Sequence, residues 1–193
     1  MIESIKNFGE IFHKQNQIEI NNNEIIYKFK KCLEKVKQSK KYTITGPNDN
    51  IITKTGTNNW MGAICENQLN NQIEYKWKIK ILNSSQHKNI MIGISPIDII
   101  VNSSSYYKCG WYLNCNNSTL CSGPPHNYLN QKTNLKKVKN EIIVILNIPK
   151  KSLKFIIDNE DKGESYFDIP IDKPLSPAVL LSSQNDSVEI VAC

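Results

Sequence analysis

The chain has 193 residues, of which 39% are hydrophobic, and its 24 basic and 18 acidic side chains give a formal net charge of +6. This length suits one well-buried domain with an appendage, and no uninterrupted apolar run approaches the roughly 18 residues needed to cross a bilayer. Every basic residue is lysine, and because arginine is the side chain that reads phosphates and guanine edges bidentately, specific nucleic-acid binding is disfavoured. The first residues lack the compact apolar core of a secretory signal. We therefore expect a cytoplasmic protein that does not enter membranes.

The six cysteines, at positions 32, 65, 109, 115, 121 and 193, contain no Cys-x-x-Cys pair, and the chain has three histidines. This spacing is not typical of zinc ligands, so we expect no metal and no cofactor. In a cytoplasmic protein these cysteines are expected to be reduced thiols that are partly buried.

The first part of the chain, residues 1–40, has no proline, one glycine and apolar residues at helical spacing. Two such sets occur: Ile5, Phe8 and Phe12, then Ile25 or Ile26, Phe29, Cys32 or Leu33, and Val36. We therefore predict a helical N-terminal segment with two short helices, over residues 3–17 and 24–38, separated by a break or cap at Asn21–Asn23. Isolated helices of about 15 residues are marginal in water. These helices are expected to dock on the remaining domain, on a second copy or on another protein.

From Tyr42 onward, short runs of β-branched and aromatic residues alternate with turn clusters, which is typical of an all-β sandwich. The clearest run extends from Glu74 to Ile81, where apolar residues alternate with charged ones and predict a strand with one wet face. Further strands are predicted over residues 51–54, 61–65, 89–95, 111–115, 119–122, 141–147, 152–158, 177–182 and 187–191. Polar turns are predicted at Asn116–Ser118, at Pro149–Lys151 and at Asn159–Gly163, the last with a glycine for a left-handed position.

Three patterns are candidates for catalytic or metal sites. Cys121 and His126 resemble a nucleophile with its base, but they flank a Gly-Pro-Pro loop with no obvious orienting group. The stretch Asp158–Gly163 has oxygen ligands for calcium, but Lys162 occupies the fifth position and no helices flank it, which favours a hairpin turn. Asp168 and Asp172 are more simply solvated loop acids than a glycosidase pair. We predict no catalytic residues, no metal ligands and no enzyme.

The lysines at 132, 136, 137 and 139 form the densest basic group of the second half of the chain. Such a group attracts nucleic acid or an anionic surface in some proteins. Lysines that flank a strand are more often a solvated face and a protected sheet edge, which is the interpretation we prefer.

Several runs together resemble the recurring blocks of a SPRY domain. The blocks are Tyr75–Ile79, Ile90–Ile94, Cys109–Leu113, Cys121–Tyr128, Leu153–Asn159 and Pro177–Leu181, in that order. The resemblance covers about residues 42–193 and names the SPRY/B30.2-like family. It implies a jelly-roll-like sandwich of two antiparallel sheets that binds peptides or protein surfaces through loops at one end, without catalysis.

Contact residues in such a domain are expected on loops, where tyrosine and histidine combine apolar area with hydrogen bonding and prolines keep loops rigid. The candidate partner-binding residues are Asn58, Asn59, Tyr106, Tyr107, Pro124, Pro125, His126 and Tyr128. The alternative for Tyr128 and the two prolines is that they only close the sandwich. The three tryptophans, Trp60, Trp77 and Trp111, are expected in the core.

The main hypothesis is a non-enzymatic adaptor or scaffold: a SPRY sandwich at 42–193 that binds a protein or peptide ligand. The helices of residues 1–40 would dock it to a further partner or mediate self-association. One alternative is an architectural subunit permanently embedded in a larger assembly. A weaker one is a sugar-binding lectin, which depends only on the similar architecture of jelly-roll sandwiches.

Overall fold

The computed structural model describes residues 25–29, 42–57, 60–70, 72–85, 89–98, 108–128, 131–135 and 137–193, and these residues form thirteen β-strands and no α-helix. Seven strands form one antiparallel sheet in the spatial order β1 (Tyr42–Thr45), β2 (Ile51–Lys54), β13 (Ser187–Ala192), β4 (Glu74–Asn83), β9 (Glu141–Asn147), β10 (Ser152–Ile157) and β11 (Glu160–Tyr166). Six strands form the other, in the order β3 (Met61–Ile64), β12 (Leu175–Leu181), β5 (Ile90–Pro96), β6 (Trp111–Asn114), β7 (Thr119–Ser122) and β8 (Gln131–Lys132). No described segment forms a helix of the length and hydropathy needed to span a membrane.

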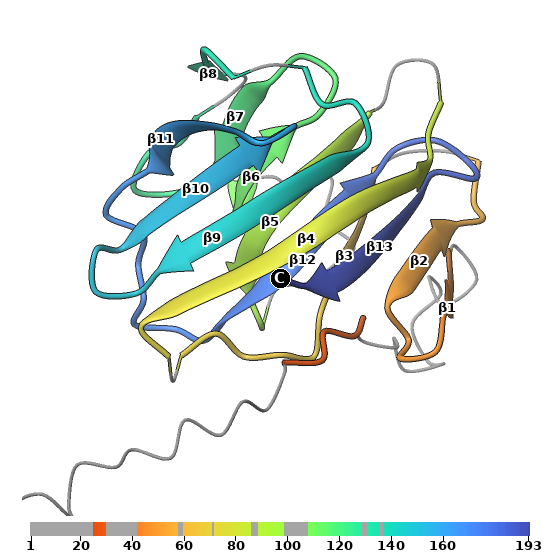
Figure 1. Ribbon diagram of the computed structural model, residues 1–193, viewed down its shortest axis with the longest axis horizontal. Helices are drawn as coiled ribbons and strands as arrows, with labels where there is room; N and C mark the ends of the chain where they lie inside the picture. The colour runs from red at the N-terminus through yellow and green to blue at the C-terminus, as the bar shows by residue number, and fades with distance from the viewer. Residues whose placement is uncertain are drawn as a thin grey trace, which may run out of the picture.

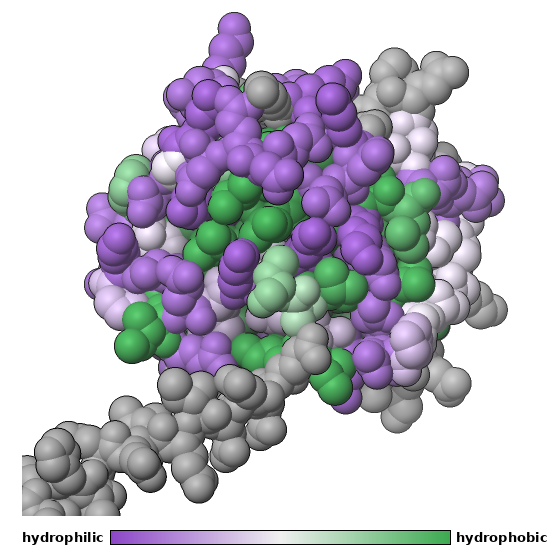
Figure 2. All heavy atoms as spheres, viewed as in Figure 1, coloured by the Kyte–Doolittle hydropathy of each residue, from purple (hydrophilic) through white to green (hydrophobic). Residues whose placement is uncertain are grey.

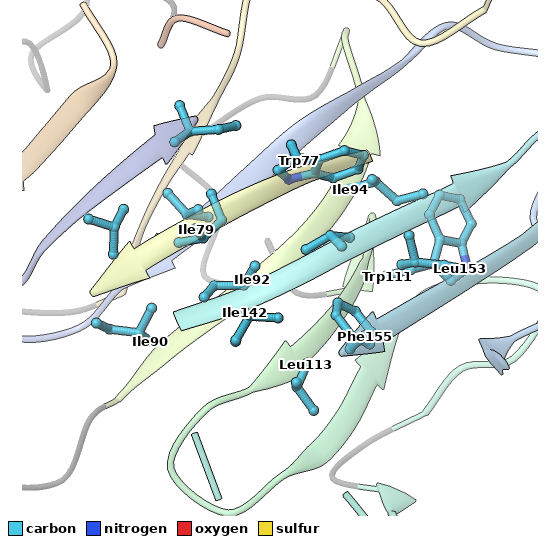
Figure 3. Packing of buried hydrophobic residues seen from close by; sticks show 14 of the residues in the cluster. Trp77, Ile79, Ile90, Ile92, Ile94, Trp111, Leu113, Ile142, Leu153 and Phe155 are labelled. Carbon is cyan, nitrogen blue, oxygen red and sulfur yellow. The ribbon is translucent and has the colours of Figure 1, made fainter. Parts of the chain in front are cut away.

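The two sheets lie face to face and enclose one large apolar core (Figure 1). In the seven-stranded sheet, Trp77 and Ile79 of β4 lie beside Val144 and Ile142 of β9 in the strand register. Ile92, Ile94 and other residues of the six-stranded sheet face them from the opposite layer (Figure 3). Because side chains alternate between the two faces of a strand, every second residue of β4, β5 and β9 reaches this core. The predicted two-layer antiparallel sandwich is confirmed.

The outer faces of the two sheets differ. On the seven-stranded sheet, lysines 76, 78 and 80 of β4 point outward, and the space-filling view shows a mostly hydrophilic face with separate apolar patches (Figure 2). Ion pairs join Lys78 to Glu141 at 3.3 Å and Lys80 to Glu189 at 3.2 Å. The outer face of the six-stranded sheet instead has a small buried apolar cluster: Ile64, Met91, Tyr112, Cys121, Ala178 and Leu180.

Residues 25–29 correct the prediction of a helix over residues 24–38. They are extended, with Tyr27 and Phe29 buried and Ile26 and Lys28 exposed. Phe29 forms an isolated antiparallel bridge with Cys65, and the Glu66 N–H donates to the Lys28 carbonyl at 2.9 Å. The β-branched and aromatic residues of this segment favour an extended conformation. The spacing of its apolar residues fits a helix equally well, so the sequence alone does not distinguish the two. The other predicted helix, over residues 3–17, lies outside the described residues.

The hairpin turns follow the polar clusters of the sequence, with one correction. The turns around Asn116–Ser118 and Pro149–Lys151 connect β6 to β7 and β9 to β10. The third turn is shorter than predicted, since Asp158 and Asn159 alone connect β10 to β11, with φ of 50° and 64°. Positive φ at both central residues is the geometry of a type I′ turn. Residues 160–163 instead begin β11, where Gly163 has the predicted left-handed conformation, with φ of 86°.

Candidate functional site

The sandwich has two open sides, because each sheet ends in edge strands. On one side the edges are β1 and β3, and residues 25–29 pack there against Cys65. On the other side the edges are β8 and β11, which lie near each other in Figure 1. The segment Gly123–Tyr128, which contains four of the candidate contact residues, leads from β7 toward β8 on this second side.

The segment Gly123–Tyr128 is held at both ends by the backbone. The Gly123 N–H donates to the Gly110 carbonyl at 3.1 Å, and the Ser122 N–H donates to the Tyr128 carbonyl at 2.9 Å. A Cβ atom at Gly123 would meet the Lys108 carbonyl oxygen at 1.8 Å, so only glycine allows this close approach. A loop fixed in this way loses little conformational entropy when it binds a partner.

The aromatic residues of this loop pack on the edge strand β11. The His126 and Tyr128 rings lie 5.0 Å apart, and the Tyr128 ring stacks on Tyr166 at 5.8 Å. The Tyr166 hydroxyl lies 2.8 Å from the Tyr112 carbonyl and 3.0 Å from the Cys121 carbonyl, so its single proton is shared between two strands of the opposite sheet. Burial raises the pKa of the Tyr166 phenol well above its ordinary value. The neutral Tyr166 side chain therefore links β11 to the opposite sheet and supports the loop.

The loop presents both polar and apolar surface. Pro124 and Pro125 are exposed, whereas His126 and Tyr128 are half-buried. The Nδ1 atom of His126 is buried and has no hydrogen-bond partner. Tyr128 packs against the main core with one part of its ring and borders a pocket with another. The structure thus brings Pro124, Pro125, His126 and Tyr128 together on one rigid loop.

Between the edge strands lies a hollow of about 240 Å³, which we call the edge pocket. It is lined by Leu120, Tyr128, Gln131, Lys132, Thr133, Asn134, Leu135, Lys162, Glu164 and Ser165. Leu120 and Leu135 both belong to the main core, so the lining combines two buried leucines with mainly polar residues. The Thr133 Oγ1 donates to the Ser118 carbonyl at 2.6 Å and accepts from the Leu135 N–H at 3.0 Å. These bonds fix the wall formed by residues 131–135.

The wall formed by β11 owes its shape to irregular pairing. Its register with β10 shifts on either side of Lys154, which is the signature of β-bulges. The Asp161 carboxylate accepts from the Gly163 N–H at 2.8 Å and pairs with Lys154 at 2.8 Å. Hydrogen bonding to Lys154 lowers the pKa of Asp161 from its ordinary value. The bulged strand brings Lys162, Glu164 and Ser165 to the same pocket.

The position of the other predicted contact residues stays a prediction. Asn58, Asn59, Tyr106 and Tyr107 lie outside the described residues. Trp60 directly precedes Met61, the first residue of β3. Met61 and Ile90 both pair with Leu181 of β12, so Trp60 lies at the end of the sheet where β5 begins. Ser122 pairs with Trp111, which pairs with Ile94 near the end of β5. Trp60 and the Gly123–Tyr128 loop are therefore at opposite ends of the six-stranded sheet.

The expectation that all three tryptophans are core residues is wrong for Trp60. Trp77 and Trp111 are buried, but Trp60 is 39% exposed. Trp60 lies just before β3 and outside the sheet register. The sequence Gly56-Thr57-Asn58-Asn59 before Trp60 is typical of a turn or loop, so the sequence already indicated that this tryptophan lies near a loop.

Two kinds of surface residue were missed in the sequence. The edge-pocket residues of β8 and β11 come from segments with no apolar alternation. Phe167 is 56% exposed directly after the buried Tyr166. Adjacent residues of a strand point to opposite faces, so the Tyr166–Phe167 pair already indicates that one of these two rings faces solvent.

The residues weighed as catalytic or metal ligands have structural positions. Cys121 is buried in the small outer cluster beside Tyr112, and His126 packs on Tyr128 and Tyr166. Asp158 is a turn residue of the β10–β11 hairpin. Within the described ranges, no three side chains of histidine, cysteine, aspartate or glutamate gather as a metal site.

No family model matches the chain, and neither does any curated protein sequence. Solved structures do match. The SPRY domain of human HERC1 has a TM-score of 0.62 at 17% identity, covering 85% of this chain and 97% of that one. The TRIM65 PSpry domain has a TM-score of 0.59 at 10% identity, and the match covers 86% of this chain and 88% of that one. A human SPRY domain has a TM-score of 0.60 at 14% identity, and the match covers 78% of this chain and 94% of that one. The described part of this chain has the SPRY fold, as the resemblance in its sequence indicated.

Proposed function

We propose that this protein is a non-enzymatic interaction module that binds a peptide or a protein surface at the Gly123–Tyr128 loop and the adjoining edge pocket. The observation that carries the proposal is the combination of a rigid loop with exposed prolines and a hollow of side-chain size directly beside it. Tyr128 belongs to both, because it stacks on Tyr166 and lines the pocket. Tyrosine is among the residues that most often carry binding energy in protein interfaces.

The N-terminal segment, residues 1–40, has two parts that are treated differently. The docking or self-association role of the helix over residues 3–17 stays a prediction. Residues 25–29 belong to the sandwich by their contacts, so a truncation that leaves the β-domain intact should begin at residue 25 and not after residue 40.

The proposed site is tested with a library of random dodecapeptides displayed on phage, selected on the immobilised full chain. We expect enriched peptides whose affinity, measured by fluorescence polarisation, falls at least about tenfold on the Tyr128→Ala protein. Tyr128→Phe keeps the ring and is expected to stay within about threefold of wild type. Trp60→Ala, at the opposite end of the sheet, is the matched control and should leave affinity unchanged.

Two outcomes contradict the proposal. If the folded protein enriches no peptide, the alternative of an architectural subunit without an exchangeable ligand is favoured. If Trp60→Ala weakens binding while Tyr128→Ala does not, the protein binds peptides at the other end of the sandwich.

A further inference from the structure

The size of the edge pocket decides what kind of group it can hold. Its volume of about 240 Å³ lies below the roughly 300 to 1,000 Å³ of sites for drug-sized ligands and cofactors. It also far exceeds the roughly 30 Å³ that a single water occupies. One protein side chain with a few waters matches this space. The pocket is therefore better suited to one residue of a bound peptide than to a free cofactor.

The chemistry of the lining points to a side chain with an apolar stem and an acceptor at its end. Leu120, Leu135 and the Tyr128 ring form the apolar part. The walls have hydrogen-bond donors from amide, hydroxyl and ammonium groups, and Glu164 is the one carboxylate among the lining residues. A carboxylate accepts hydrogen bonds at both oxygens and donates none when ionised, so it complements walls of this kind.

Among the residues that the structure describes, the charges around the pocket leave one cation without an ion pair. Lys162 forms an ion pair with Glu160. Glu164 lies opposite Lys154 in the strand register, and its charge helps to raise the pKa of Lys154. Lys132, in contrast, is exposed and forms no ion pair with any residue in the described ranges. Its backbone is held by pairing with Thr119 of β7. Lys132 is thus a lining residue at the wall opposite β11 whose charge is not balanced by an ion pair within the described residues.

The alternative that a ligand adds as a strand to the free edge of β11 fits the structure less well. Charged side chains at Asp161, Lys162 and Glu164 and the two register shifts are the features by which edge strands resist pairing with another chain. Side-chain insertion between the two edges needs no such pairing.

We propose that the edge pocket receives the carboxylate of an aspartate or glutamate side chain of a bound peptide, with Lys132 as its counter-ion. The Tyr128 ring and the two leucines contact the aliphatic stem of this side chain. The proposal rests on the proposed function and adds the class of residue that the site selects.

The experiment uses the same random dodecapeptide library on three full-length proteins: wild type, Lys132→Glu and Lys137→Glu. Lys137 is also exposed and does not line the pocket, so its reversal makes the same change in net charge elsewhere. Wild type and Lys137→Glu should enrich peptides with an acidic residue at one fixed position. Lys132→Glu should lose that enrichment and favour lysine or arginine there.

A single selected peptide makes the result quantitative. Its acidic residue is changed to glutamine, to lysine and to phosphoserine, the last to ask whether any anion suffices. We expect the glutamine and lysine peptides to bind wild type at least about tenfold more weakly. The lysine peptide should regain affinity on Lys132→Glu, and binding of the acidic peptide should weaken with added salt because the lysine is exposed.

The outcomes separate this inference from the proposed function. Peptides that depend on Tyr128 but show no acidic preference, or keep that preference on Lys132→Glu, overturn the inference and leave the function in place. Failure to enrich peptides on wild type overturns the function itself.

Discussion

Tyr166 is the residue on which the geometry of the candidate site most depends. Its ring supports Tyr128 and His126, and its hydroxyl reaches the carbonyls of Tyr112 and Cys121 in the opposite sheet. We expect Tyr166→Phe to lower the free energy of unfolding by about 1 to 2 kcal/mol, because a buried hydrogen bond is lost while the ring is kept. Urea denaturation followed by tryptophan fluorescence measures this change as a shift in midpoint at constant slope.

Tyr128→Phe is the matched control for Tyr166→Phe. The Tyr128 phenol is half-buried, and its loss is expected to change stability by less than about 0.5 kcal/mol. Equal losses in the two variants would show that the hydroxyl of Tyr166 does not tie the sheets.

The grouping of the candidate contact residues could be predicted from the sequence only in part. Pro124, Pro125, His126 and Tyr128 are neighbours in the chain, so their grouping on one loop needed no knowledge of the fold. The edge pocket needed it, because Lys132 and Lys162 come from strands at the edges of different sheets. No local pattern marks two polar residues that meet only when the layers stack.

At the scale of single elements, the segment 25–29 packs by an isolated bridge on the side of the sandwich opposite the candidate site. Phe29 is 1% exposed and Ile26, in the same segment, is 57% exposed. Phe29→Ala should therefore lower the free energy of unfolding by about 3 to 5 kcal/mol, the usual loss for a buried phenylalanine. Ile26→Ala should change it by less than about 0.5 kcal/mol. Urea denaturation of both variants measures the difference.

A comparable loss at Ile26 would contradict the extended conformation of residues 25–29. Ile26 and Phe29 are three positions apart, so an amphipathic helix would place them on one face and make both substitutions costly. A strand places residues 27 and 29 on one face and residue 26 on the other. The pair thus distinguishes the two conformations directly.

The elements that were predicted correctly carry one of two signals: a short run of residues buried on both faces, as in β5 and β12, or alternation between a buried and a more exposed face, as in β9. β4, with lysines on one face and Tyr75, Trp77 and Ile79 on the other, is the clearest case of alternation. β11 and β8 lack both signals, since an edge strand with the sequence Glu-Asp-Lys-Gly-Glu-Ser-Tyr has one inward apolar residue and reads as a turn. β1, Tyr42–Thr45, was not predicted either; it is an edge strand with one buried residue.

At the scale of the whole molecule, several ionisable groups are buried in their neutral forms. Burial raises the pKa of the Tyr27 and Tyr166 phenols above their ordinary value of 10.0, and that of the Cys65 thiol above 9.0. In the unfolded chain these groups ionise near their ordinary values. Above about pH 9 the unfolded state therefore binds fewer protons than the folded state, and alkaline pH favours unfolding.

We expect the stability that these groups provide to be fully present below about pH 9 and to be lost as the pH rises toward the raised pKa values of the folded state. Each group contributes up to about 1.4 kcal/mol per pH unit above its ordinary pKa. Urea denaturation at pH 8 and pH 11 should therefore show a fall in the free energy of unfolding of up to about 5 to 6 kcal/mol. Tyr27→Phe keeps the ring that packs 5.9 Å from Trp77 and removes a hydroxyl with no hydrogen-bond partner. Its fall should be smaller by about 1.4 kcal/mol, whereas a fall equal to that of wild type would mean that Tyr27 is not buried as a neutral phenol.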